Sequence, residues 1–159
     1  MMKFKNFSFG ATSAVITSLA VLVGLSKTVN AVVNIVSALL IIAIADNVSD
    51  SFGIHVHQES QDEPPQEVRK ATFLNFITRL VIVLIFILFV ILLPMNLAVI
   101  FSIIFGLSII IILSYFIARQ QKINPYVAIF RHLLLTVAVM VASYFLREIS
   151  SNIIAKFKK

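Results

Sequence analysis

The sequence predicts an all-α integral membrane protein with five transmembrane helices. Of its 159 residues, 60% are hydrophobic and 13% are charged, which leaves too few polar side chains to cover the surface of a water-soluble fold. The charged residues also lie far apart, because Lys5 and Lys27 bracket 21 uncharged residues and Arg79 and Arg119 bracket 39. A helix needs about 20 apolar residues to cross a bilayer. Uncharged runs of this length are therefore typical of membrane spans.

The expected spans are roughly residues 8–26, 31–57, 70–93, 97–118 and 125–147, in a single domain over residues 1–159. The longest uncharged run would extend about 58 Å as one helix, so it must hold two spans. Pro94, followed by Met95 and Asn96, supplies the break between them. The apolar residues after Arg79 show no alternation with polar ones, which argues against the strands of a β-barrel.

The first span has an alternative interpretation. Residues 1–31 have a basic beginning, an apolar stretch and a Val-x-Ala ending, which is typical of a cleaved signal peptide and would leave four spans. However, Gly10, Ser13, Thr17 and Gly24 recur at spacings of three, four and seven, which places them in one stripe of a helix. Small side chains in such a stripe let another helix approach closely, so we expect the segment to be a packed span.

Basic residues at the helix ends predict the orientation. On the five-span scheme, eight Lys and Arg residues lie on the side of the N-terminus and five lie on the other side. This distribution favours a cytoplasmic N-terminus. A short chain without targeting extensions fits a prokaryotic cell membrane, so we expect a multi-pass protein of the plasma membrane. The same residues form no basic stripe beside stacking aromatics, which argues against nucleic acid as a partner. The chain has no cysteine, which excludes disulfides, thiolate ligands and thiol catalysis.

Acidic residues gather where the second span ends. Six of the seven acids lie between residues 46 and 67, and two of the three histidines lie there too. Asp46, Asp50 and His57 are separated by four and seven residues, so a helix that continues from the apolar run would carry all three on one face, with Gly53 between them. Acidic side chains in the last turns of a membrane-spanning helix are costly in free energy unless they are paired or face water.

His55 and Glu59 point to another side of the same helix and are further candidate ligands. Oxygen and imidazole ligands together suit Mn²⁺, Fe²⁺ or Zn²⁺, and a pair of acids can also take up protons. The prolines and charges of "QDEPPQE", residues 61–67, predict a solvated connection to the third span. The sequence therefore predicts a metal site or a proton site at the end of the second span.

Arginine pairing is the competing explanation of these acids. Arg79 and Arg131 fall one or two turns inside the third and fifth spans, on the same side of the membrane as Asp46 and Asp50. Pairing between aspartate and arginine would satisfy the charges without any transported ion.

The order of these features resembles the vacuolar iron transporter family. Its first helix opens like Phe-Gly-Ala-Asn-Asp-Gly and continues with a Thr pair, compared with "FGATSAVITS" at 9–18. Its second helix ends like Ala-Asp-Ala-Leu-Ser-Met, followed by Gly-Glu-Tyr and Ser-Glu, compared with "ADNVSDSFGIHVHQES" at 45–60. The start of its third helix is similar to "ATFLNF" at 71–76. The resemblance gives the residues expected to line the pathway or to pack beside it, namely Ser13, Thr17, Asn47, Ser49 and Gly53.

The resemblance implies a homodimer of five-helix subunits that exchanges Fe²⁺ or Mn²⁺ for protons, with no permanently bound cofactor. Three positions depart from the family pattern. Its first-helix aspartate falls on Ser13, its methionine ligand falls on Asp50, and its glutamate after the glycine falls on Ile54. These departures imply either a rearranged metal site built on Asp46, Asp50 and His57, or a loss of transport.

Two functions follow as predictions. The first is a proton-coupled transporter of divalent metal, whose partners are the bilayer, the ion and a second copy of the chain. The alternative is a membrane scaffold or accessory subunit that keeps the fold without transport. An enzyme is not expected, because the chain has no Gly-x-Ser-x-Gly, Ser-x-x-Lys or His-Glu-x-x-His arrangement, and the aspartate stretch "ADNVSDSFG" at 45–53 lacks the Asp-Gly and Ala-Arg pairs of phosphatidyl transferases.

Overall fold

The structure, a computed structural model, describes the backbone of residues 2–157 and the side chains of residues 7–154, 156 and 157. Every regular element within this range is helical. In chain order the elements are α1 (Met2–Leu25), α2 (Ala31–Ile41), the π-helical segment η1 (Ile42–Asp46), α3 (Asn47–Glu59), α4 (Pro65–Leu92), α5 (Met95–Gln120) and α6 (Pro125–Phe157). Since α2, η1 and α3 follow one another without a break, they form a single long helix.

Within the described residues, five helices are long and apolar enough to cross a membrane, which confirms the predicted all-α architecture at this level. The break at Pro94 is also confirmed, because α4 ends at Leu92 and α5 begins at Met95. Leu93 is extended, as the residue before a proline must be, and Pro94 caps the next helix. The two helices are therefore joined by a tight hairpin.

Two helix boundaries differ from those expected. The third span begins at Pro65 and not near residue 70, since a proline in the first turn needs no backbone N–H partner and its φ suits a helix. Part of the predicted solvated connection thus belongs to α4, and residues 60–64 form the turn. The last helix continues to Phe157, ten residues beyond the expected end at 147, because neither glycine nor proline interrupts it there.

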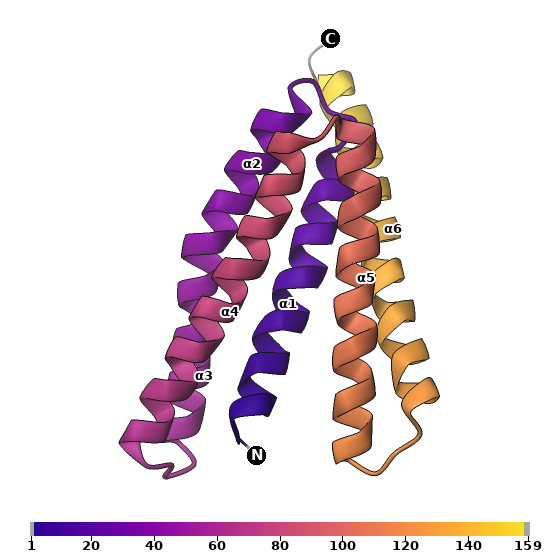
Figure 1. Ribbon diagram of the computed structural model, residues 1–159. Helices are drawn as coiled ribbons and strands as arrows, with labels where there is room; N and C mark the ends of the chain where they lie inside the picture. Colours follow the sequence, from indigo (N-terminus) through magenta and orange to yellow (C-terminus); the bar gives the residue numbers. More distant parts are fainter. Residues whose placement is uncertain (1, 158–159) are drawn as a thin grey trace.

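Helix α1 occupies the centre of the bundle. It packs against α4, α5 and α6 and makes fewer contacts with α2. Figure 1 shows α1 between a group formed by α2, α3 and α4 and a second group formed by α5 and α6. Its side chains Ala14, Val15, Leu19 and Leu22 are fully buried, together with Phe86 of α4. The core of the bundle therefore surrounds the first span. A protein of four spans, with residues 1–31 removed as a signal peptide, would lack this central helix.

The stripe of small residues on α1 contacts two different helices. A Cβ atom at Gly10 would collide with the Asn75 side chain of α4. A Cβ atom at Gly24 would lie 3.4 Å from the Ser143 carbonyl oxygen of α6. Small side chains thus let α1 approach α4 near one end and α6 near the other.

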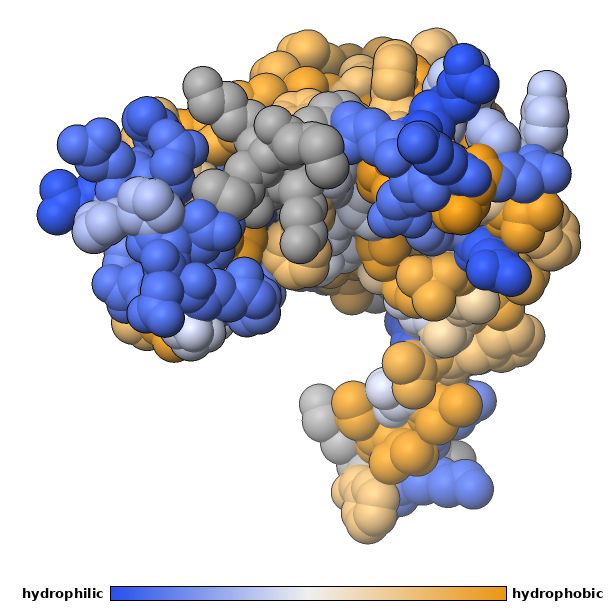
Figure 2. Space-filling model, turned by 90° about the horizontal axis from the view of Figure 1, so that it is seen from below, coloured by the Kyte–Doolittle hydropathy of each residue, from blue (hydrophilic) through white to orange (hydrophobic). Residues whose placement is uncertain are grey.

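The connections alternate between the two ends of the bundle. The N-terminus lies at the same end as the α3–α4 and α5–α6 connections, and the C-terminus lies at the opposite end (Figure 1). Figure 2 looks at the N-terminal end and shows hydrophilic side chains in two groups, with hydrophobic side chains around and behind them. Among the basic residues behind the orientation argument, the side chains of Lys3 and Lys5 and residues Lys158 and Lys159 lie outside the described residues.

Candidate functional site

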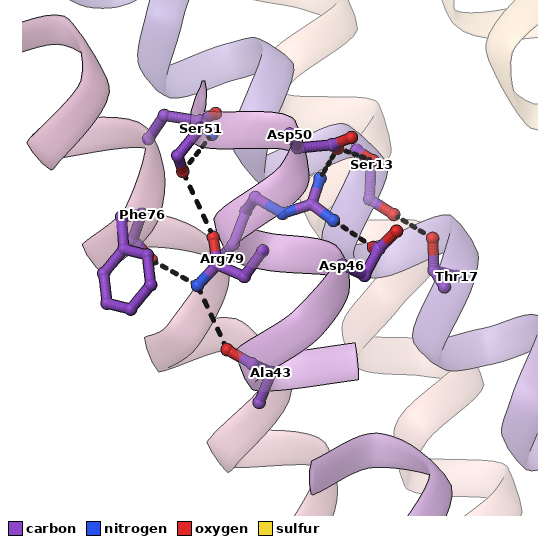
Figure 3. A network of polar contacts seen from close by, with 10 residues as sticks. Ser13, Thr17, Ala43, Asp46, Asp50, Ser51, Phe76 and Arg79 are labelled. Carbon is purple, nitrogen blue, oxygen red and sulfur yellow. Dashed lines mark hydrogen bonds and ion pairs between the residues drawn. The ribbon is translucent and has the colours of Figure 1, made fainter. Parts of the chain in front are cut away.

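One arginine holds both aspartates of the second span. Arg79, at the middle of α4, is 1% exposed, and its two terminal nitrogens bind Asp46 and Asp50 (Figure 3). Asp46 ends the π-helical segment and Asp50 lies in the first turn of α3, so both reach the same side chain of the neighbouring helix. The carboxylates stay partly open, because the Asp46 side chain is 43% exposed and that of Asp50 is 32% exposed. We call Asp46, Arg79 and Asp50 the ionic centre.

The π-helical segment Ile42–Asp46 lies directly before this centre. A π turn holds one residue more than an α turn, so it rotates every later side chain relative to an uninterrupted helix. It contains no glycine or proline that could mark it in the sequence. Interruptions of this kind occur frequently at functional sites, and here the interruption ends on one of the two acids.

Two hydroxyl side chains of α1 lie beside the carboxylates of the ionic centre. Ser13 Oγ donates a hydrogen bond to Asp50 Oδ2 at 3.3 Å, and Thr17 Oγ1 donates to the Ser13 carbonyl oxygen at 2.9 Å (Figure 3). Both residues are half-buried. Ser13 stands at the position of the family's first-helix aspartate, so this chain presents a neutral hydroxyl to Asp50 where the resemblance would give a third carboxylate.

A layer of buried amides and hydroxyls joins α3 to α4 beside the ionic centre. Asn47 Nδ2 donates to the Phe76 carbonyl oxygen at 2.9 Å and to the Ala43 carbonyl oxygen at 3.3 Å. Ser51 Oγ donates to Asn47 Oδ1 at 3.4 Å, and Asn75 Nδ2 donates to Ser51 Oγ at 3.0 Å. These bonds bind the two helices at the level of the ion pairs and thereby position Arg79.

Sequence reasoning found Asn47 but missed Ser51 and Asn75. Their spacing carried a signal, since Ser51 follows Asn47 by one turn and Asn75 precedes Arg79 by one turn. Two buried polar atoms of this region have no hydrogen-bond partner among the described residues, namely Asn75 Oδ1 and Arg79 Nε. Buried polar atoms are normally paired, so these two are candidates for contact with water.

The histidines lie away from the ionic centre. His55 Nδ1 is 3.2 Å from Thr72 Oγ1, and His55 Nε2 is 3.3 Å from Glu59 Oε1. His57 is exposed, with its Nε2 atom 3.3 Å from Gln61 Nε2. His57 shares a face with Asp50 by spacing, but seven residues of helix separate the two by about 10 Å along the axis. That separation is too large for both side chains to reach one ion.

The remaining predicted residues lie outside the centre too. Ser49 and Gly53 are exposed, and a Cβ atom at Gly53 would meet nothing within 4 Å. Arg131 is exposed on α6 and makes no ion pair with the described residues, so Arg79 alone takes the role expected of the two arginines. Within the described part of one copy, no three His, Asp or Glu side chains lie close enough to hold a metal ion together.

The fold and the ionic centre define a class of protein, a helical protein with five helices able to cross a membrane and an arginine buried between two aspartates. No protein-family model, no curated protein and no solved structure matches the chain. Its similarity to the vacuolar iron transporter family therefore stays a prediction from its sequence motifs.

Proposed function

We propose that the chain transports divalent cations, Fe²⁺ or Mn²⁺, across a membrane in exchange for protons, and that Asp46 and Asp50 bind the ion. The observation that carries this proposal is the charge of the ionic centre. Two carboxylates share a single guanidinium group, so the centre has a formal charge of −1, and both carboxylates remain partly exposed. An anionic, accessible centre on membrane-spanning helices is suited to hold a passing cation.

The depth of the centre supports a functional role. Arg79 lies about 20 Å from the Leu92 end of α4, whereas the hydrocarbon core of a bilayer is about 30 Å thick. Charged side chains at such depth cost about 2.5 to 3.5 kcal/mol each on insertion scales and are rare outside pathways for ions and protons. A centre needed only to join two helices would be built at lower cost from apolar side chains.

The same charge favours a homodimer. One copy offers a charge of −1 and two carboxylates, whereas a divalent cation carries +2 and prefers about six oxygen ligands when it is Mn²⁺. Two copies whose open carboxylate faces meet would offer −2 and four carboxylates, with the Ser13 and Thr17 hydroxyls beside them. This arrangement would also cover the exposed part of Asp46, which lipid would otherwise contact.

Proton exchange follows from the same balance. When the ion leaves, one proton on each copy would neutralise the two centres, so two protons would replace one divalent ion. We further propose the plasma membrane as the location, with the N-terminus in the cytoplasm. The excess of basic residues on the N-terminal side supports this orientation.

We expect Asp46→Asn and Asp50→Asn to lower Mn²⁺ flux into proteoliposomes by at least about tenfold each, since each removes an anionic ligand. A pH gradient should increase the flux of the wild-type protein. Glu59→Gln is the matched control and should keep the flux, because Glu59 contacts His55 and lies outside the ionic centre. Unchanged flux in an Asp46→Ala, Asp50→Ala double variant would refute the site.

The dimer is tested by cross-linking, for which the lack of cysteine makes single substitutions clean. Thr17→Cys, on the half-buried stripe of α1 beside the ionic centre, should form a disulfide-linked dimer in membranes treated with a mild oxidant. The control is Phe73→Cys on α4, where the native Phe73 is 68% exposed. This variant should stay monomeric. Cross-linking at position 73 but not at position 17 would place the interface elsewhere.

A second function is favoured by a specific observation, namely that Arg79 binds both acids of the centre. On this alternative the chain is a membrane scaffold or accessory subunit, and the ion pairs serve only to join α3 and α4. Calorimetry that detects no binding of Mn²⁺ or Fe²⁺, together with a partner protein that co-purifies without metal, would favour the scaffold over the transporter.

A further inference from the structure

A groove separate from the ionic centre runs along the outer face of α3 and α4. It has a volume of about 500 Å³ and is lined mostly by apolar atoms. Three phenylalanine rings form much of its wall, Phe52 from α3 and Phe73 and Phe76 from α4. Phe52 is 64% exposed and Phe73 is 68% exposed, so nothing within the described chain covers them. The groove is therefore an apolar surface that the surrounding medium must fill.

One rim of the groove is cationic. Arg69 lines it, is exposed, and makes no ion pair or hydrogen bond with the described residues. The other polar side chains of the rim are already engaged. Thr72 Oγ1 donates to the Val68 carbonyl oxygen at 2.9 Å and lies 3.2 Å from His55 Nδ1, and the other ring nitrogen of His55 faces Glu59. The guanidinium of Arg69 is thus the unpaired charge of this groove.

The groove has a direction relative to the bundle. Arg69 lies one turn after the start of α4 at Pro65. The α3–α4 connection, and with it the start of α4, lies at the N-terminal end of the bundle (Figure 1), where hydrophilic side chains gather (Figure 2). Phe76 lies seven residues further along α4, about 10 Å deeper toward the apolar middle of the helix. The charged rim therefore lies at the level of lipid head groups, and the phenylalanine rings lie at the level of acyl chains.

We propose that this groove binds one anionic phospholipid, whose phosphate pairs with Arg69 and whose acyl chain lies over Phe52, Phe73 and Phe76. Charge complementarity selects the head group, because a free guanidinium offers two parallel donors to phosphate oxygens. Phosphatidylglycerol, an anionic lipid, has no ammonium of its own to compete for that phosphate, whereas phosphatidylcholine has one. The bilayer around the helices supplies the occupant. The proposal depends on the membrane location of the helices and not on transport.

Native mass spectrometry of the full chain in detergent tests the proposal, with phosphatidylglycerol and phosphatidylcholine titrated separately. We expect the wild-type protein to bind phosphatidylglycerol about fivefold more tightly. Arg69→Gln should remove this preference, and Arg69→Lys should keep most of it. Phe73→Ala should weaken the binding of both lipids, since it removes an exposed part of the apolar wall.

Arg119→Gln is the matched control, since Arg119 is also exposed and lies in the last turn of α5 at the same end of the bundle. It should leave the preference for phosphatidylglycerol intact. Equal loss in the Arg69 and Arg119 variants would indicate general surface charge and overturn the proposal. Equal binding of the two lipids by the wild-type protein would overturn it as well, as would displacement of phosphatidylglycerol by millimolar inorganic phosphate alone. An unchanged helical circular dichroism spectrum verifies that each variant is folded.

Discussion

Arg79→Met is expected to lower the free energy of unfolding by about 3 to 5 kcal/mol. The variant keeps the volume of the side chain but leaves Asp46 and Asp50 without their common partner. Two carboxylates four residues apart would then repel each other at a depth where lipid cannot solvate them. Thermal or denaturant unfolding of the purified protein in detergent, followed by circular dichroism, measures the loss.

A charge-balanced variant separates this cause from simple loss of packing. Combining Arg79→Met with Asp46→Asn and Asp50→Asn removes all three charges, and we expect it to recover most of the lost stability, because a neutral group of similar volume needs no counter-ion. Arg131→Met is the control for arginine as such and should change stability little, since that side chain is exposed. If the triple variant is no more stable than Arg79→Met, ion pairing is not what Arg79 contributes.

Gly10→Ala is expected to destabilise the protein by about 1 to 3 kcal/mol, although alanine is the better helix former. The added methyl group would collide with the Asn75 side chain, which is fully buried and donates to Ser51 Oγ. Either α1 must move away from α4, or Asn75 must give up its hydrogen bond. Unfolding measured under the same detergent conditions shows the effect.

Gly53→Ala is the matched control for this prediction. A Cβ atom at Gly53 meets nothing within 4 Å, and the residue lies inside α3. We therefore expect the free energy of unfolding to rise by about 0.5 to 1 kcal/mol, because alanine loses less backbone entropy than glycine when the chain folds. The prediction for Gly10 would be contradicted if both substitutions raised stability by the same amount.

Gly10→Ala and Arg79→Met affect the same layer of buried polar side chains. Asn75 lies one helical turn before Arg79 and bonds to Ser51, which bonds to Asn47 beside Asp46. A Gly10→Ala change that displaces Asn75 would therefore also loosen the contact that positions Arg79. We expect the effects of Gly10→Ala and Arg79→Met to be non-additive for this reason, as neighbouring sites in one network usually are.

Several features of the fold were within reach of the sequence. Uncharged runs longer than a bilayer is thick require crossings, and Pro94 marks the point where one run must turn back. The continuation of α6 beyond residue 147 was missed because mostly polar residues follow at 148–152, and the hydropathy of a segment says where it can cross a membrane but not where its helix ends.

The candidate site was only partly within reach. Helical spacing placed Asp46 and Asp50 on one face and named Arg79 and Arg131 as candidates to neutralise them. Spacing grouped His57 with the aspartates as well. A shared helix face, however, says nothing about the distance between two residues along the helix axis. The π-helical segment before Asp46 has no glycine or proline to mark it, and the spacing of Ser51 and Asn75 gives a face of each helix but not that the two faces meet.

The sequence by itself determined that the chain forms five apolar helices long enough to cross a membrane, since length and hydropathy are properties of each segment alone. Only the tertiary structure decided that Arg79 binds both acids, that Arg131 binds neither and that the histidines lie elsewhere. The physical reason is that helical periodicity orders side chains around one axis. Which side chain of a neighbouring helix reaches them depends on the packing of helix against helix, and here small residues such as Gly10 set how closely α1 and α4 approach.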